Sequence, residues 1–400
     1  MIGPHPPAPS PSGRGGVSPF SEIQPYSSKV SLLKRLLLGA YTAAYERAAR
    51  PLLFRSTAGE AHEHMLRLLA RLDNTAGAAL LAGVRRATTA EQPVYVGGVT
   101  LASPFMLAAG FVKGVGFDDE ASASAYTGDL IPGWRAMPAL VGAVEFGSFT
   151  RWPRVGNSGL VMWRDVAAQS TQNRVGLRNP GVRAAALFLG ARREKMPPVW
   201  GINLAPSPGV NDDNVLRAEL LDSLDLLLDA GLTPNWFTLN LSCPNTEDDP
   251  GARQTGQQAD TLTSALARRL ESAGIPLWVK LGPALGDEQY RVLLNVCAQT
   301  GVRAIVATNT LGQPTPDDPN VVAGVGGGSI RPHALAAVRL LAEERARTGS
   351  PVDLVGCGGV LDGASARAFL DAGASAVQYW SALVYRGPLA AAVMAAEAVN

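Results

Sequence analysis

Cysteine and histidine are scarce in this sequence, which has three and four of them among 400 residues. The cysteines are far apart and form no CxxC pair: Cys243, Cys297 and Cys357. Neither a disulfide framework nor a zinc site is expected, and a reducing cytosolic environment fits best. None of the histidines follows a predicted strand, and no HExxH motif occurs: His5, His62, His64 and His333. We therefore expect no catalytic metal, and we predict that His62 and His64 are surface or packing residues.

Two further features are missing. Lysine plus arginine (35) nearly balance aspartate plus glutamate (34), so the formal charge of +1 gives no overall field that would attract nucleic acid. No apolar run approaches the roughly 18 residues of a membrane span, and the N-terminus lacks the pattern of a signal peptide. The expected location is cytoplasmic.

The N-terminal region differs in composition from the rest of the chain. Residues 1–28 are rich in Pro, Ser and Gly and are predicted to be disordered. Two amphipathic patterns over residues 29–83, with an expected break at Arg50-Pro51, predict a helical hairpin. This hairpin is either a packing cap on the main domain or a surface that contacts lipid or an apolar co-substrate, and the sequence leaves both open.

Residues 84–400 alternate short apolar runs with helical segments, after a predicted β-hairpin around Gly97-Gly98. The eight runs are FMLAAG (105–110), AVEFGS (143–148), VWGINL (199–204), WFTLNL (236–241), LWVKLG (277–282), AIVATN (304–309), VDLVGC (352–357) and AVQYWS (376–381). Eight such units predict an α/β fold of the (β/α)8 TIM-barrel type. A doubly wound sheet is the alternative, but no GxGxxG follows the first run.

Polar side chains follow these runs, where a barrel has its active site. Several asparagines lie there, and their amides can bind a planar molecule that carries amides and a carbonyl. Glycine-rich turns at 324–329 and 356–360 are suited to bind phosphate, and Lys280 can stabilise negative charge on a reduced flavin ring. Together these features predict FMN as the cofactor.

The motifs resemble those of the dihydroorotate dehydrogenases. They occur in the family's order: AAGFVKG, VEFGSFTRWPRVGN, NRVGLRNPG, GINLAPS, LNLSCPNT, VKLGP, ATNT, GGGSIRP and GCGGVLDGASARAFLDAGASAVQYWS. Such an ordered set is far more specific than any single motif. The N-terminal hairpin is similar to that of the membrane-associated, quinone-using class 2 enzymes.

The resemblance implies FMN-dependent oxidation of dihydroorotate to orotate in pyrimidine biosynthesis. A base takes a proton from C5 while a hydride passes from C6 to the flavin. The base position falls on Cys243, oriented by Thr246; class 2 enzymes carry serine there, and cysteine marks class 1. Reoxidation by quinone is implied, as is a peripheral position at the inner face of the cell membrane through residues 29–83.

The resemblance also implies the binding residues. Lys113 would lie near both substrate and flavin and take part in catalysis. The substrate would be held by Lys113, Asn173, Asn240, Asn245, Asn309 and Thr310. FMN would be held by Ala109, Gly110, Ser148, Asn203, Asn240, Lys280, Thr308, Gly328, Gly359, Trp380 and Ser381.

Several positions depart from the family pattern. They are Val112 for an acidic residue, Leu177-Arg178 for Phe-Asn, Ile330 for glycine, Trp380 for tyrosine, and extra sequence at 126–138. Because Leu177 and Arg178 fall near the substrate residues, one alternative is a paralogue that oxidises or reduces another cyclic amide or enone. A non-catalytic flavin-binding barrel is a third hypothesis, against which the retained asparagines, both lysines and the thiol argue.

Overall fold

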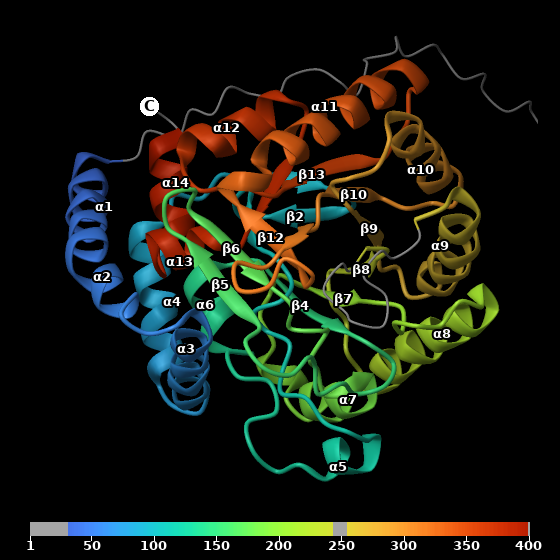
Figure 1. The fold of residues 1–400 in the computed structure, drawn as a ribbon, viewed down its shortest axis with the longest axis horizontal. Helices are drawn as coiled ribbons and strands as arrows, with labels where there is room; N and C mark the ends of the chain where they lie inside the picture. The colour runs from blue at the N-terminus through green and yellow to red at the C-terminus, as the bar shows by residue number, and fades with distance from the viewer. Residues whose placement is uncertain (1–30, 243–253, 399–400) are drawn as a thin grey trace, which may run out of the picture.

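The computed structural model describes residues 31–242 and 254–398. The predicted disordered tail and three predicted site residues, Cys243, Asn245 and Thr246, lie outside the described residues. The described chain forms a barrel of parallel strands surrounded by helices, with a group of N-terminal helices at one side (Figure 1).

Eight parallel strands close the barrel, in the order β3-β4-β7-β8-β9-β10-β13-β14 and back to β3. Each predicted apolar run coincides with one of them, and only β4 extends a residue past its run: β3 (Phe105–Leu107), β4 (Val144–Phe149), β7 (Trp200–Leu204), β8 (Trp236–Asn240), β9 (Leu277–Leu281), β10 (Ala304–Ala307), β13 (Asp353–Cys357) and β14 (Ala376–Tyr379). Nearly every residue of these strands is buried, because one face packs inside the barrel and the other against helices. The predicted (β/α)8 fold is confirmed.

Helices surround the barrel in Figure 1 and pack their apolar sides on it. They are α5 (Glu120–Ala125), α6 (Ala136–Val141), α7 (Gly181–Gly190), α8 (Asp213–Asp229), α9 (Gly256–Glu271), α10 (Asp287–Gln299), α11 (Arg331–Thr348), α12 (Gly363–Asp371), α13 (Ser381–Arg386) and α14 (Ala390–Ala398). The predicted hairpin, β1 (Val94–Val96) and β2 (Val99–Leu101), lies at the start of the barrel strands. There Trp278 Nε1 donates to the Gly97 carbonyl at 2.9 Å, and a Cβ on Gly97 would lie 2.4 Å from that nitrogen. The hairpin therefore closes the N-terminal end of the barrel.

A second, antiparallel sheet lies at the opposite end. Its strands, in order, are β11 (Leu311–Pro314), β12 (Val322–Gly327), β6 (Ser170–Asn173) and β5 (Met162–Asp165). They belong to the segments that follow β4 and β10, so they emerge from the C-terminal ends of the barrel strands. In Figure 1, β5, β6 and β12 lie across the barrel mouth.

The N-terminal helices are α1 (Leu32–Ala44), a π-helical turn (Tyr45–Ala49), α2 (Arg50–Leu53), α3 (Ala58–Asp73) and α4 (Gly77–Thr88). The expected break at Arg50-Pro51 is wrong, because the helical path continues to Leu53. In the π turn the Arg50 N–H reaches the Tyr45 carbonyl, and this wider turn accommodates the proline ring that an α-helix would not. No helix in the described ranges has the length and apolar character needed to cross a membrane.

Buried polar contacts attach these helices to the barrel. Asp73 of α3 is 3% exposed and accepts the backbone N–H groups of Gly133, Arg135 and Ala136 at 2.6, 3.0 and 2.7 Å. Burial raises the pKa of the Asp73 carboxyl to about 6, against the lowering effect of these three N–H groups. The extra sequence at 126–138 thus supplies the start of α6 as a docking point for α3.

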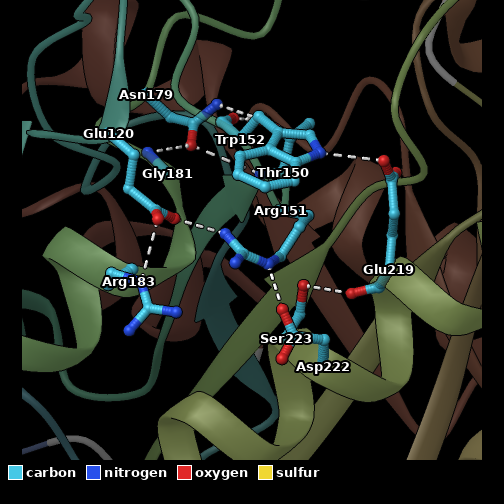
Figure 2. Close-up of polar contacts among 10 residues, drawn as sticks. All are labelled: Glu120, Thr150, Arg151, Trp152, Asn179, Gly181, Arg183, Glu219, Asp222 and Ser223. Atoms are coloured by element: carbon cyan, nitrogen blue, oxygen red, sulfur yellow. Dashed lines mark hydrogen bonds and ion pairs between the residues drawn. The ribbon is translucent and has the colours of Figure 1, made fainter.

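A polar cluster fixes the loops that follow β4 and β6 (Figure 2). Arg151, only 6% exposed, pairs with Glu120 and Asp222, and its guanidinium lies 4.1 Å from the Trp152 ring centroid. The Asn179 amide accepts the Gly181 N–H at 2.9 Å and donates to the Thr150 hydroxyl at 2.8 Å. These contacts hold the strand-end loops in place beside the barrel mouth.

Candidate active site

A cavity of about 520 Å³ extends from the barrel mouth to the N-terminal helices. At one end it is lined by residues from the C-terminal ends of the barrel strands and from β6 and β12. At the other end its walls come from the π turn, α2 and α3. This volume is in the size range of small-molecule sites. We call the end at the barrel mouth the polar chamber and the end between the N-terminal helices the apolar chamber.

Most of the predicted site residues that the structure describes meet in this cavity. Those in its lining are Ala109, Gly110, Lys113, Ser148, Asn173, Asn203, Asn240, Lys280, Thr308, Asn309, Thr310, Gly359, Trp380 and Ser381. At the end of β12 the lining comes from Gly326 and Gly327, and Gly328 lies one residue beyond the strand. A Cβ on Gly328 would lie 2.1 Å from the Ala168 carbonyl, so the backbone packing there explains this glycine.

The predicted asparagine group is partly assembled by direct contacts. Asn309 Nδ2 lies 3.2 Å from Asn240 Oδ1, and Asn240 Nδ2 donates to the Ser148 hydroxyl at 3.2 Å. Asn309 also donates to the carbonyl of Ser242, the last described residue before Cys243. These bonds fix two amides at the start of the predicted base loop.

Lys280 forms the floor of the polar chamber. The side chain is 5% exposed, and its Nζ donates to Gln378 Oε1 at 3.2 Å and approaches Cys357 Sγ at 3.6 Å. Burial raises the pKa of the Cys357 thiol, so the sulfur accepts as a neutral group. The polar chamber thus has an ammonium group at its base. A positive charge there can stabilise the negative charge that a ring gains when it accepts electrons.

Unsatisfied acceptors and bare backbone mark space for a polar ligand. Asn203 Oδ1 and Thr310 Oγ1 are buried without a hydrogen-bond partner, which is costly unless a ligand or water completes them. A Cβ on Gly327 would meet the Gln169 carbonyl at 2.5 Å, and one on Gly359 would meet the Arg331 Cβ at 2.4 Å, so close packing requires glycine at both positions. Both glycines have positive φ and line the cavity. An isoalloxazine ring and a phosphate fit this distribution of donors and acceptors.

The apolar chamber is lined by one face of the N-terminal helices. Its residues are Tyr45, Ala49, Leu53, Phe54, Ala58, Ala61, His62, Met65 and Leu69. His62 packs edge-on against Phe111, with ring centroids 5.5 Å apart, and its centroid lies 6.4 Å from that of Trp380. Burial, and then the charge of Lys113, lowers the pKa of His62 to about 4, so the imidazole is neutral near pH 7.

The prediction that His62 is a surface or packing residue agrees with its packing against Phe111, and the structure adds that it lines the cavity. Its helical spacing from Ala58, Ala61, Met65 and Leu69 places these residues on one face of α3, but the spacing does not say what that face packs against. Arg164, Cys357 and Gln378 also line the cavity and were not predicted. In the described part of the chain no three His, Cys, Asp or Glu side chains gather to hold a metal ion.

Comparisons with known proteins agree with this geometry. Residues 93–398 match the family model described as dihydroorotate dehydrogenase. The chain is 32% identical to dihydroorotate dehydrogenase (quinone) of Chromobacterium violaceum over 351 residues, covering 85% of this chain and 93% of that protein. It is 31% identical to the Pseudomonas aeruginosa protein of the same name over 358 residues, with 85% and 94% covered.

Solved structures of similar fold include two of DHODH from Eimeria tenella. The ligand-free form gives a TM-score of 0.64 at 21% identity, covering 84% of this chain and 92% of that one. The ferulenol complex gives a TM-score of 0.63 at 22% identity, with 80% and 89% covered. At these identities the likeness supports the fold alone.

Proposed function

Because the chain belongs to the dihydroorotate dehydrogenase family, we propose that this oxidoreductase converts dihydroorotate to orotate with bound FMN and passes the electrons to a quinone. One observation carries the proposal: a single cavity connects the polar barrel mouth with an apolar chamber between the N-terminal helices. A hydrophilic substrate and a hydrophobic acceptor can thus reach opposite ends of one site.

The polar chamber would hold FMN. Asn203 would offer an unsatisfied acceptor, Lys280 an ammonium group, and Gly327 and Gly359 cavity-lining backbone near the phosphate. FMN supplies the hydride acceptor when bound. The Lys280 charge stabilises the negative charge that reduction adds to the ring.

Asn173, Asn240, Asn309 and Lys113 would bind the substrate, and Cys243 would take the C5 proton. A thiol with an ordinary pKa of about 8.5 ionises far more readily than a serine hydroxyl, so Cys243 needs less activation than a serine base. Thr246 would orient the thiol.

The apolar chamber would bind the quinone ring, close to Trp380 and the neutral His62. Leu53 lines this chamber and is also 38% exposed, so the chamber reaches the protein surface at α2. Five leucines nearby, on α1 and α2, are more than half exposed: Leu32, Leu33, Leu36, Leu37 and Leu52. They would insert into a membrane surface and place the chamber at the source of quinone.

Two measurements test the proposal. Purified protein should be yellow, and a colourless protein that takes up no added FMN would contradict it. Anaerobic dihydroorotate should bleach the flavin absorbance, and a ubiquinone analogue should restore it. If saturating dihydroorotate leaves the flavin oxidised, the substrate assignment is wrong even though FMN binds.

A further inference from the structure

Glu145 of β4 is a fully buried carboxylate inside the barrel, at 0% exposure. Its Oε1 accepts from Trp236 Nε1 at 3.1 Å and from the Thr238 hydroxyl. Its Oε2 accepts from Asn203 Nδ2 at 3.2 Å and Gln378 Nε2 at 3.3 Å. All four partners donate to it, so both of its oxygens serve as acceptors.

The two partners on Oε2 both line the cavity, and a carboxylate can only accept from them. The Asn203 amide must turn its NH2 to Glu145, which leaves Oδ1 as the buried acceptor without a partner. The Gln378 amide must do the same, so its Oε1 faces Lys280 Nζ at 3.2 Å. One carboxylate therefore determines the hydrogen-bonding polarity of two amides at the chamber floor.

The same arrangement supplies a counter-charge for Lys280. Gln378 joins the ammonium to the Glu145 carboxylate, while the neighbouring Cys357 thiol accepts without charge. A buried charged group is stabilised by opposite charge and hydrogen-bond acceptors nearby, and this network supplies both.

We propose that Glu145 is a positioning residue for the flavin: it fixes Asn203 as an acceptor and, through Gln378, holds Lys280 as the ammonium donor toward the ring. This inference rests on the proposed FMN binding and extends it to a residue that does not line the cavity. Flavin offers a ring N–H to an acceptor and a carbonyl to an ammonium, which matches the two groups so presented.

Substitution of Glu145 by glutamine tests this polarity. Trp236 Nε1 can only donate, so the new amide must keep its oxygen there and turn its NH2 toward Asn203 and Gln378. Asn203 would then point its own NH2 at the cavity. That NH2 would face the flavin N–H, so two donors would meet and the flavin N–H would lose its acceptor. We expect Glu145→Gln apoprotein to bind FMN about tenfold more weakly or worse, measured by quenching of flavin fluorescence.

The matched control is Thr238→Val, which removes a donor from Oε1 and leaves both cavity-facing amides as they are. It should bind FMN within about threefold of wild type, since the one hydrogen bond that is lost lies away from the ligand. The double variant Glu145→Gln/Asn203→Asp should regain most of the affinity. The carboxylate introduced at position 203 would accept from the new NH2 and still present an oxygen to the cavity.

The results separate the possible outcomes. Wild-type FMN affinity in Glu145→Gln overturns the inference. A double variant that binds FMN no more tightly than Glu145→Gln also overturns it, because a purely structural role predicts additive losses.

If Glu145→Gln does not unfold cooperatively, Gln378→Met replaces it as the test variant. That variant should lower the midpoint potential of bound FMN by about 30 mV, equal to tenfold weaker stabilisation of the reduced form. An unchanged potential overturns the inference, whereas wild-type protein that takes up no FMN contradicts the proposed function itself.

Discussion

Arg178 Nη2 lies 2.8 Å from Glu63 Oε1, and this ion pair joins the loop between β6 and α7 to helix α3. The loop carries Leu177, which has a positive φ of 54° and lines the cavity. The side chains of the pair are 31% and 45% exposed. Both partners influence His62: Glu63 raises its pKa, and Arg178 lowers it. The loop that departs from the family pattern is thus joined to α3 by an ion pair.

Exposure limits what this ion pair contributes to stability. We expect Glu63→Gln to reduce the free energy of unfolding by less than about 1 kcal/mol at low salt, and the effect to fade at about 1 M salt. Urea unfolding at both salt concentrations checks this. A loss above about 2 kcal/mol that persists in salt would show that the pair has a larger structural role.

The low pKa of His62 predicts a pH dependence of stability. Its folded-state pKa of about 4 lies below the usual 6.5, so the unfolded state binds the proton first as pH falls. Wild type should lose up to about 3 kcal/mol between pH 6.5 and pH 4 relative to His62→Phe. Urea unfolding across this range measures the difference, with the exposed His333→Phe as the matched control. Parallel profiles for wild type and His62→Phe would refute the neutral imidazole.

Asp73 should be essential for docking α3. Asp73→Ala leaves three backbone N–H groups without their acceptor, and we expect it to lower the free energy of unfolding by about 3 kcal/mol. Asp129→Ala is the control, since this exposed carboxylate accepts from the Asn74 side chain at 2.9 Å and its loss should cost about 0.5 kcal/mol. Equal effects of the two substitutions would exclude a special role for Asp73.

Cys243 should be required for substrate oxidation and not for flavin binding. Cys243→Ala should keep FMN and lose flavin bleaching by dihydroorotate, measured by anaerobic stopped flow. Cys243→Ser should bleach slowly at neutral pH and faster as pH rises, because a hydroxyl ionises less readily than a thiol. Cys297→Ala, which removes a thiol from the core of α10, is the control for losing a cysteine. Normal bleaching by Cys243→Ala would remove the assigned role.

The exposed leucines of α1 should bind lipid. Replacing Leu33, Leu36 and Leu37 with serine should weaken sedimentation with phospholipid vesicles at least about tenfold, since each leucine would bury apolar area in the interface. Leu187→Ser on α7, which lies at the bottom of the barrel in Figure 1 and away from α1, is the control. Equal vesicle binding by the triple variant and wild type would leave the packing-cap role as the remaining one.

Short apolar runs predicted all eight barrel strands, because a parallel strand buried on both faces needs continuous apolar sequence. The helix boundary at Pro51 was less predictable, since a π turn can accommodate a proline that would otherwise end a helix. The rule that barrel sites lie at strand ends also located the polar chamber, and Lys280, Asn203 and Asn240 line it as expected.

By itself, the sequence determined the barrel, the family and most of the side chains at its mouth, because these depend on local hydrophobicity and on residues at fixed places along each strand. The tertiary structure alone decided how Glu145, Asn203, Gln378 and Lys280 share one network, since they come from four strands far apart in sequence. It also decided that His62 faces a cavity, because the partner of a helix face depends on packing that periodicity does not specify.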